Sequence, residues 1–307
     1  MDTQTKPERA LELQNLFSIW KRRKEKIRNR TDKAEFPFGI KKLDDITHGI
    51  TKGKVTVIAG RTSEAKTSFA LQGAFNIANT GKTVLYITLE DDSEQIAERI
   101  FSNIMEVDNQ ALIQGMVSDE ILDSPAMEKI FKSVKFVPVQ DFGHNFDEIK
   151  KTIESINPKP DIVFIDYVQM IEQLPRESEY EALSRFSQQL KKFAEKNDVG
   201  LVIISQINRS GAKDGRPQAH HLQGCGRLEQ VCDLLLILYC PFNSNDSSFD
   251  GGMEECPRDY VEVIIAKNKN GQRNWVVPTR FTGKYYKFTT WEVEDTTTEK
   301  DFKWYQK

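Results

Sequence analysis

The residues best suited to chemistry lie in a turn with the sequence GRTSEAKTS, from Gly60 to Ser68. Lys66 and Thr67 follow Gly60 at the spacing of a phosphate-binding loop, whose pattern is G-x-x-x-x-G-K-[ST]. In such a loop, backbone N–H groups and the N-terminus of the next helix surround the phosphates, the lysine reaches the outer phosphates and the hydroxyl binds Mg²⁺. We therefore expect a nucleotide to be bound by Gly60, Arg61, Thr62, Ser63, Glu64, Ala65, Lys66, Thr67 and Ser68.

Two residues of this loop depart from the pattern. Ala65 stands where the second glycine belongs, and a Cβ there hinders backbone angles and a close phosphate approach that glycine permits. Glu64 is an acid beside the phosphates and would repel them unless its side chain points away. Because alanine is the smallest substitute for glycine, we expect nucleotide binding to survive and hydrolysis to follow.

Three more polar side chains end apolar runs. Asp166 closes the apolar part of DIVFIDYVQM, where a carboxylate at a strand tip beside the phosphate loop can hold Mg²⁺ or its water. Glu90 ends TVLYITLE and is placed to polarise an attacking water, while Asp92 or Ser93 caps the next helix. Gln206, in GLVIISQ, faces the same edge as a candidate γ-phosphate sensor.

Alternating patterns predict the elements that hold these residues. Apolar runs separated by helical patterns indicate β-α-β units and a mostly parallel sheet flanked by helices on both faces. The apolar runs are residues 55–60, 83–90, 134–140, 161–170 and 200–205. From residue 233 onward, short strands joined by turns indicate antiparallel strands at the sheet edge, so the predicted class is α/β.

Composition bounds the kind of protein. The chain has 307 residues and a net charge of -3, which excludes a general nucleic-acid coating protein but not an enzyme that threads a strand through a channel. The four cysteines lack zinc-ligand spacing and are interpreted as reduced thiols. No apolar run of about 18 residues and no apolar signal core occur in the sequence, so we expect a cytoplasmic protein without membrane contact.

Taken in order, the motifs resemble the RecA-type ATPase motor domain of the DnaB-type replicative DNA helicases of bacteria and phages. The resemblance runs from about Phe36 to Phe288 and is carried by FGIKKLDDITHGITKGKVTVIAGRTSEAKTSFA, LYITLEDDSEQIAERI, IVFIDYVQMI, IISQINRS, RPQAHHLQGCGRLEQVCDLLLILY and VEVIIAKNKNG. It implies a RecA-like phosphate-loop fold, the cofactors ATP and Mg²⁺, and a hexameric ring with ATP sites between subunits.

The resemblance also implies roles for single residues. Lys66 and Thr67 match the phosphate-loop lysine and the Mg²⁺ hydroxyl, and Glu90, Asp166 and Gln206 match the catalytic glutamate, the Mg²⁺ aspartate and the sensor glutamine.

A basic pair in the family's K-x-R-N-G segment reaches the γ-phosphate of the neighbouring subunit. Here the segment is KNKNG, so Lys267 and Lys269 take these positions and a lysine replaces the arginine finger. A lysine supplies the charge without the planar fork, so we expect weaker stabilisation across the interface. No partner for two cations is evident within their own subunit.

The DNA-facing loop departs from the family as well. The family shows an Arg-Glu pair before SGSIEQDAD, whereas the arginine here has moved to Arg227. A glycine-rich loop can still hold phosphates of a single strand through its backbone N–H groups. The predicted DNA contacts are Gln223, Gly224, Cys225, Gly226 and Arg227.

The chain divides into three predicted regions. Residues 1–35 hold a helix, residues 7–30, with an apolar face at Leu11, Leu16, Phe17 and Trp20 and a basic end, which matches the family's linker helix and implies docking on an adjacent subunit. Residues 36–290 form the motor domain and 291–307 a tail. We expect no collar or primase domain before residue 36, and therefore a minimal, phage- or mobile-element-type motor.

The predicted function is that of an ATP-dependent replicative helicase subunit whose hexamer moves on single-stranded DNA and unwinds duplex. A separate primase, a helicase loader or a polymerase are further candidate partners. One alternative is a DnaB-like ring that binds nucleotide with little or no turnover and serves as a scaffold or regulator, which Ala65 and Lys269 favour. A recombinase is a weaker alternative, because it needs an oligomerisation strand where the pattern predicts a helix.

Overall fold

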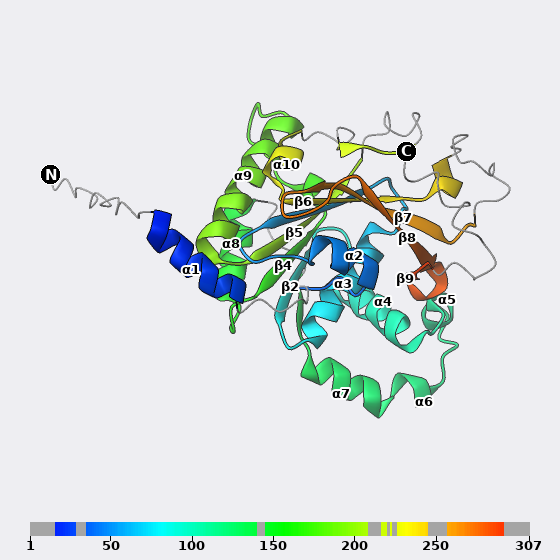
Figure 1. Ribbon diagram of the computed structural model, residues 1–307. Helices are drawn as coiled ribbons and strands as arrows, with labels where there is room; N and C mark the ends of the chain where they lie inside the picture. Colours follow the sequence, from blue (N-terminus) through cyan, green and yellow to red (C-terminus); the bar gives the residue numbers. More distant parts are fainter. Residues whose placement is uncertain are drawn as a thin grey trace. The chain divides into compact units, whose positions relative to one another are not determined.

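The computed structural model describes residues 16–28, 35–139, 145–207, 216–219, 222, 226–244 and 257–291 (Figure 1). The chain forms two compact units, Met1–Lys33 and Ala34–Lys307. In the first unit, α1 spans Leu16–Arg28, and its side chains Leu16, Phe17 and Trp20 are exposed. Leu11 of the predicted helix lies outside the described residues.

The second unit contains one nine-stranded sheet with the order β3-β2-β4-β5-β1-β6-β7-β8-β9. Strands β1 to β6 pair in parallel, and β7 to β9 extend the sheet in antiparallel fashion, as predicted. The strands are β1 Val55–Gly60, β2 Thr83–Thr88, β3 Lys135–Val139, β4 Ile162–Asp166, β5 Gly200–Gln206, β6 Leu234–Tyr239, β7 Tyr260–Asn268, β8 Trp275–Thr282 and β9 Lys287–Thr290.

Helices cover both faces of this sheet because side chains alternate along each strand. Two apolar clusters result. One joins the sheet to α2 Lys41–Thr47, α3 Lys66–Asn79 and α4 Ser93–Met105, and the other joins it to α8 Phe146–Ser155, α9 Glu179–Asn197 and α10 Gly226–Val231. Ile58 therefore points into the first cluster, while its neighbours Val57 and Ala59 point into the second.

Local sequence signals set the helix starts. Asp92 caps α4 through a capping box with Gln95, and Ser178 caps α9 in the same way with Glu181. Of the two caps predicted for α4, Asp92 is the correct one.

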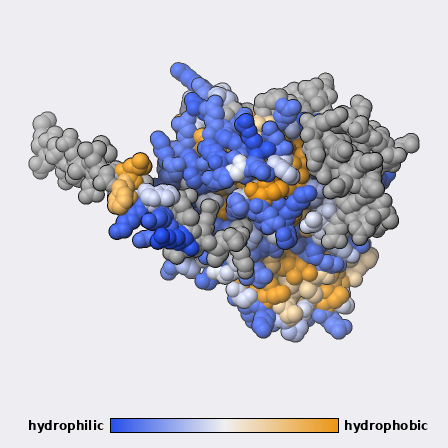
Figure 2. Space-filling view, in the orientation of Figure 1, coloured by the Kyte–Doolittle hydropathy of each residue, from blue (hydrophilic) through white to orange (hydrophobic). Residues whose placement is uncertain are grey.

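Three short helices, α5 Asn109–Ile113, α6 Asp119–Leu122 and α7 Pro125–Ser133, connect α4 to β3. This connection carries a surface that we call the apolar patch, and Figure 2 shows apolar side chains gathered over it. Its exposed members are Ile113, Met116, Ile121, Leu122 and Phe131.

Within the described residues, no helix combines the length and apolar character that a bilayer crossing requires. Cys232 and Cys240 are buried free thiols, and Cys225 and Cys256 lie outside the described residues.

Candidate functional site

The phosphate loop joins β1 to α3 at the carboxyl edge of the parallel strands. β1 lies between β5 and β6, so Gly60 ends a strand that is paired on both sides. Helix α3 begins at Lys66, and Ala65 before it has left-handed backbone angles, φ 56° and ψ 27°. Glycine adopts these angles freely, whereas they cost a residue with a Cβ about 1–2 kcal/mol. The structure therefore keeps the backbone shape of a glycine at position 65.

Lys66 is buried and turned toward its own loop. Its Nζ donates to the carbonyl of Arg61 at 2.7 Å, and 9% of the residue is exposed. Burial lowers the pKa of Lys66, and the charges of Asp166, Glu64 and Glu90 act against that shift. The ammonium group thus lies among three carboxylates and is placed to meet additional negative charge beside the loop.

Asp166 and Thr67, the two predicted metal ligands, are in contact. Asp166 ends β4 and is 5% exposed. The Tyr86 hydroxyl donates to its Oδ2 at 2.8 Å, and Thr67 also hydrogen-bonds the carboxylate. Burial raises the pKa of Asp166 above its usual 3.8, against the effect of these hydroxyls. A carboxylate in such a setting gains from a nearby cation, and oxygen ligands suit Mg²⁺.

Glu90 lies in a turn two residues beyond the end of β2 rather than at the strand end that we predicted. The Thr88 hydroxyl closes this turn by donating to the carbonyl of Asp91 at 2.7 Å and accepting its N–H at 3.0 Å. The N–H of Leu89 donates to the carbonyl of Asp166 at 2.7 Å, which ties the turn to β4. Glu90 itself is exposed, at the same sheet edge as the phosphate loop.

Gln206 lies at the end of β5, opposite Gly60 in the parallel register. Its neighbour Ser205 is fully buried and accepts a hydrogen bond from Nε2 of Gln169 at 2.9 Å. Gln169 follows β4 in a short 3₁₀ turn, so this bond connects the tips of β4 and β5. Gln206 thus lies between the strand that carries Asp166 and the strand that carries the phosphate loop.

Lys267 and Lys269 lie at the other end of the strands, beside the amino end of β6 and away from the carboxyl ends that carry the phosphate loop. β7 runs antiparallel to β6, and Asn268 pairs with Leu234 at the start of β6. The six residues of β6 rise about 3.3 Å each, so its two ends are about 17 Å apart. Both lysines are therefore remote from the phosphate loop of their own chain.

The expectation that these cations lack partners in their own subunit is wrong. Lys267 donates to backbone carbonyls of α10, and Nζ of Lys269 lies 3.2 Å from Oδ1 of Asp233. Asp233 is 6% exposed in its side chain and also pairs with Lys191 and, at 3.8 Å, with Lys54. Sequence reasoning missed Asp233 because the three lysines come from three separate segments.

The predicted DNA loop is described only in part. Gln223, Gly224 and Cys225 lie outside the described residues. Gly226 begins α10, and Arg227 is exposed in the first turn of that helix, with its guanidinium 3.2 Å from Oε1 of Gln230.

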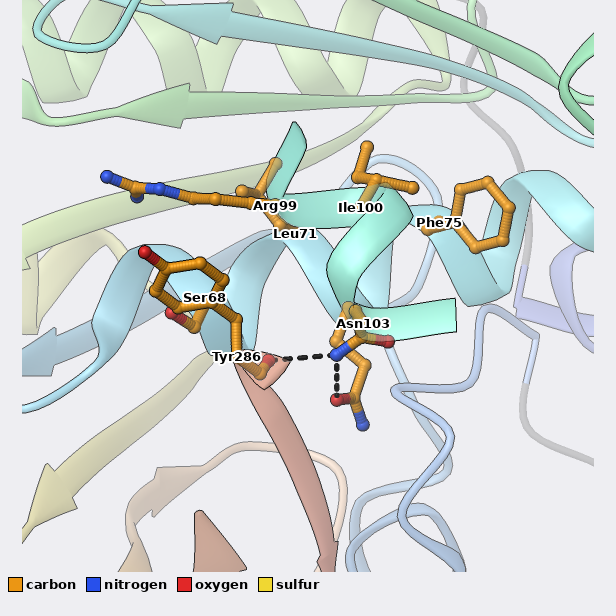
Figure 3. A pocket seen from close by; sticks show the side chains of 8 residues that line it. Ser68, Leu71, Phe75, Arg99, Ile100, Asn103 and Tyr286 are labelled. Carbon is orange, nitrogen blue, oxygen red and sulfur yellow. Dashed lines mark hydrogen bonds between the residues drawn. The ribbon is translucent and has the colours of Figure 1, made fainter. Parts of the chain in front are cut away.

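A pocket beside the phosphate loop was not predicted. It is a shallow depression, and the residues that line it are Ser68, Leu71, Gln72, Phe75, Arg99, Ile100, Asn103 and Tyr286 (Figure 3). The Arg99 guanidinium lies 5.4 Å from the centre of the Tyr286 ring and pairs with Asp91 at 2.9 Å. Asn103 fixes the wall by donating to the Tyr286 carbonyl at 2.8 Å. The only signal in the sequence was an aromatic cluster far from the loop, near residue 286.

Comparison with known proteins gives consistent matches. Residues 36–290 match the family described as "DnaB-like helicase C terminal domain". The "Probable plasmid replicative DNA helicase" of Chlamydia psittaci is 30% identical over 246 residues, which are 76% of this chain and 51% of that protein. This chain spans about half the length of that relative.

Two solved structures are similar over most of the chain. One, whose title describes it as an ATPase domain, has a TM-score of 0.78 and 26% identity and covers 91% of this chain and 99% of its own. "The Structure Of A DnaB-Like Replicative Helicase And Its Interactions With Primase" has a TM-score of 0.76 and 26% identity and covers 91% of this chain and 67% of its own. The predicted RecA-like α/β fold is confirmed, and the chain belongs to the DnaB-like helicase C-terminal domain family.

Proposed function

We propose that this chain is the subunit of an ATP-dependent replicative DNA helicase, a hexameric ring that moves on single-stranded DNA and unwinds duplex in the cytoplasm. One observation carries the proposal: Lys66, the Thr67–Asp166 contact and the Glu90 turn meet at one edge of the sheet. The names of its relatives support the replicative role.

The loop residues fit a bound Mg·ATP. Lys66 neutralises the outer phosphates, and the first turn of α3 presents its N–H groups to them. Thr67 and Asp166 are the residues that would hold Mg²⁺, and their hydroxyl and carboxylate oxygens suit it. When bound, Mg²⁺ supplies positive charge beside the phosphates.

Glu90 is the proposed general base. Its exposed carboxylate accepts a proton from the attacking water while the Thr88–Asp91 turn holds it beside the loop. Gln206, next to Gly60, is proposed to respond to the γ-phosphate, and the residue after it, Ile207, pairs with Leu222, which precedes the proposed DNA loop in the sequence. The contact of Ser205 with Gln169 keeps this sensor in register with β4.

The base of the nucleotide is proposed to pack against the surface that Arg99 and Tyr286 form. This surface includes Ser68, which follows the phosphate-loop lysine and threonine, and it offers an aromatic ring with a guanidinium beside it. Planar bases stack on such surfaces. Because Arg99 also pairs with Asp91, the wall of this pocket and the turn that carries Glu90 are joined.

Lys267 and Lys269 are proposed to act on a neighbouring subunit. They lie at the sheet edge opposite their own phosphate loop, so the phosphates that they can serve belong to another copy. This arrangement supports ATP sites that are shared between subunits.

The apolar patch is proposed as the seat of α1 from an adjacent copy. The exposed side chains Leu16, Phe17 and Trp20 of α1 need an apolar partner surface, and the patch on α5 to α7 offers one. Charge favours the same pairing, because α1 carries the basic run KRRKEKIR, while the segment that holds α5 and α6 also contains the acids Asp108, Asp119, Glu120 and Asp123. Residues 1–35, 36–290 and 291–307 are accordingly proposed as linker, motor and tail.

Residues 223–227 are proposed to hold single-stranded DNA, with Arg227 as an exposed cation at the start of α10. A primase is a candidate partner, because one similar structure is titled with its interactions with primase. A loader and a polymerase stay as further candidates.

A scaffold without turnover is not favoured. Ala65 keeps the backbone angles of a glycine, and Glu90, Asp166 and Gln206 all lie at the loop edge, so the parts that one chain would supply for nucleotide binding and water activation are together.

The function is tested by measuring ATP hydrolysis and binding of a fluorescent ATP analogue, with and without single-stranded DNA. Lys66→Ala should abolish binding, whereas Glu90→Gln should keep binding and stop turnover. Glu98→Ala, which removes an exposed acid of α4, is the matched control and should change neither. Equal binding by the unmodified chain and Lys66→Ala would refute the assignment of the loop.

A further inference from the structure

Glu64 lies in the phosphate loop, yet its side chain is buried, with 3% of the residue exposed. Its two carboxylate oxygens bind two separate segments. Oε2 accepts the N–H of Arg61 at 2.6 Å within the loop, and Oε1 accepts the N–H of Cys240, just past β6, at 3.4 Å. The side chain therefore ties the loop to the neighbouring strand and does not project toward solvent.

Both backbone polar groups of Arg61, its N–H and its carbonyl, are bound by side chains of the same loop. Glu64 accepts from its N–H, and Lys66 donates to its carbonyl at 2.7 Å. The space is tight, because a Cβ added to Gly60 would lie 3.3 Å from Oε2 of Glu64 and 3.2 Å from the Lys66 side chain. Gly60, Glu64 and Lys66 thus pack as one unit.

Ala65 lies between these fixed points and α3. Its carbonyl accepts the N–H of Phe69 at 2.9 Å, which fixes the backbone on the helix side. Glu64 fixes the backbone on the other side. With both sides held, Ala65 stays at φ 56°, where a free alanine would relax to negative φ.

The charge of Glu64 works against binding of phosphates, since it acts on both Arg61 and Lys66. An acid at position 64 must therefore contribute to the loop in a way other than by binding phosphates. Resting on the nucleotide-binding function proposed above, we propose that Glu64 is a positioning residue that holds the left-handed backbone at Ala65 and so allows alanine to take the place of the loop glycine.

Four versions of the 307-residue chain test whether Ala65 depends on Glu64. They are the unmodified protein, Glu64→Ala, Ala65→Gly and the double variant. Binding of a fluorescent ATP analogue with Mg²⁺ is measured for each. Glu64→Ala should weaken binding about tenfold when Ala65 is present, as the loss of hydrogen bonds to a charged group predicts. With Ala65→Gly, the same change should cost about twofold or less, because glycine adopts positive φ without support.

A purely structural role for Glu64 would weaken binding by the same factor in both backgrounds, and that result would overturn the proposal. Tighter binding by Glu64→Ala would overturn it too, because charge repulsion would then be the larger effect. If Glu64→Ala fails to fold, Glu64→Gln, which keeps the size and one acceptor oxygen, replaces it in the same comparison. Lys66→Ala, measured alongside, separates the two proposals: retained binding would refute the loop assignment itself.

Discussion

Replacing Lys269 with alanine tests the shared ATP site with little risk to the fold. Nζ of Lys269 lies 3.2 Å from Asp233, but the lysine side chain is 44% exposed. The Asp233 side chain is only 6% exposed, so it is the exposure of the lysine end that limits the contribution of this ion pair to the free energy of unfolding to about 1 kcal/mol. Asp233 also keeps Lys191 as a more buried partner. We therefore expect the melting temperature to fall by no more than about 4 °C.

Turnover should fall far more than stability. An arginine finger from a neighbouring subunit contributes about a thousandfold or more to phosphoryl transfer, and a lysine lacks its planar fork. We therefore expect Lys269→Ala to lower the DNA-stimulated ATPase rate about 10- to 100-fold. Lys269→Arg should raise the rate above that of the natural chain.

Lys54→Ala is the matched control. Lys54 pairs with the same aspartate at 3.8 Å and is 43% exposed, but it does not belong to the KNKNG segment. It should leave the ATPase rate unchanged. Should Lys54→Ala and Lys269→Ala lose activity alike, the effect belongs to Asp233 and not to a finger.

Mixed rings decide whether the site is shared. Rings of Lys269→Ala alone or of Glu90→Gln alone should be nearly inactive. Mixing the two variants should restore activity at interfaces that join an intact Glu90 to an intact Lys269. Full activity of Lys269→Ala alone would refute the finger assignment, and no recovery in rings shown to be mixed would count against the shared site.

Three other changes have defined outcomes. Removing residues 1–30 should shift the assembly to smaller species by light scattering, while an unchanged hexamer would show that α1 packs on its own chain. Tyr286→Leu should raise KM for ATP about tenfold with little change in kcat, because it removes stacking on the base; affinity for tripolyphosphate, which has no base, should not change. Hydrogen bonding from Arg185 lowers the pKa of Glu177 from 4.5 to about 2, so the stability that this pair contributes is present above pH 4.5 and is lost as the pH falls toward 2. Denaturation of Glu177→Gln and the natural chain across this range should therefore converge at low pH.

The parallel sheet was predictable because its strands are buried on both faces. Runs such as VTVIAG and IVFID contain almost only apolar residues, and the chemistry-bearing residues follow directly at their carboxyl ends. The same logic located Asp166 and Gln206 and the start of α3. Glu90 was placed correctly at this edge, although the Thr88 turn that carries it ends the strand earlier than the pattern indicated.

Contacts between distant segments were not predictable. Asp233 forms ion pairs with lysines from three separate segments of the chain. In the pocket wall, Arg99 contacts Tyr286, and no periodic pattern in the sequence connects these two residues. The direction of Glu64 was left open for a similar reason. Whether an acid in a loop faces phosphate or core depends on which N–H groups lie beneath it, and the N–H of Cys240 belongs to a residue that is 176 positions away in the sequence, just past the neighbouring strand β6.

The separation of Glu90 and Lys269 on opposite edges of one sheet has a genetic consequence. In the proposed ring, each copy contributes Glu90 to the ATP site at one of its interfaces and Lys269 to the ATP site at the other. A copy that lacks both residues therefore disables two ATP sites, although it fills only one position in the ring. An allele encoding Glu90→Gln together with Lys269→Ala should therefore be dominant over the normal allele and suppress replication at modest expression. An allele that cannot assemble should be recessive, because its product never enters a ring.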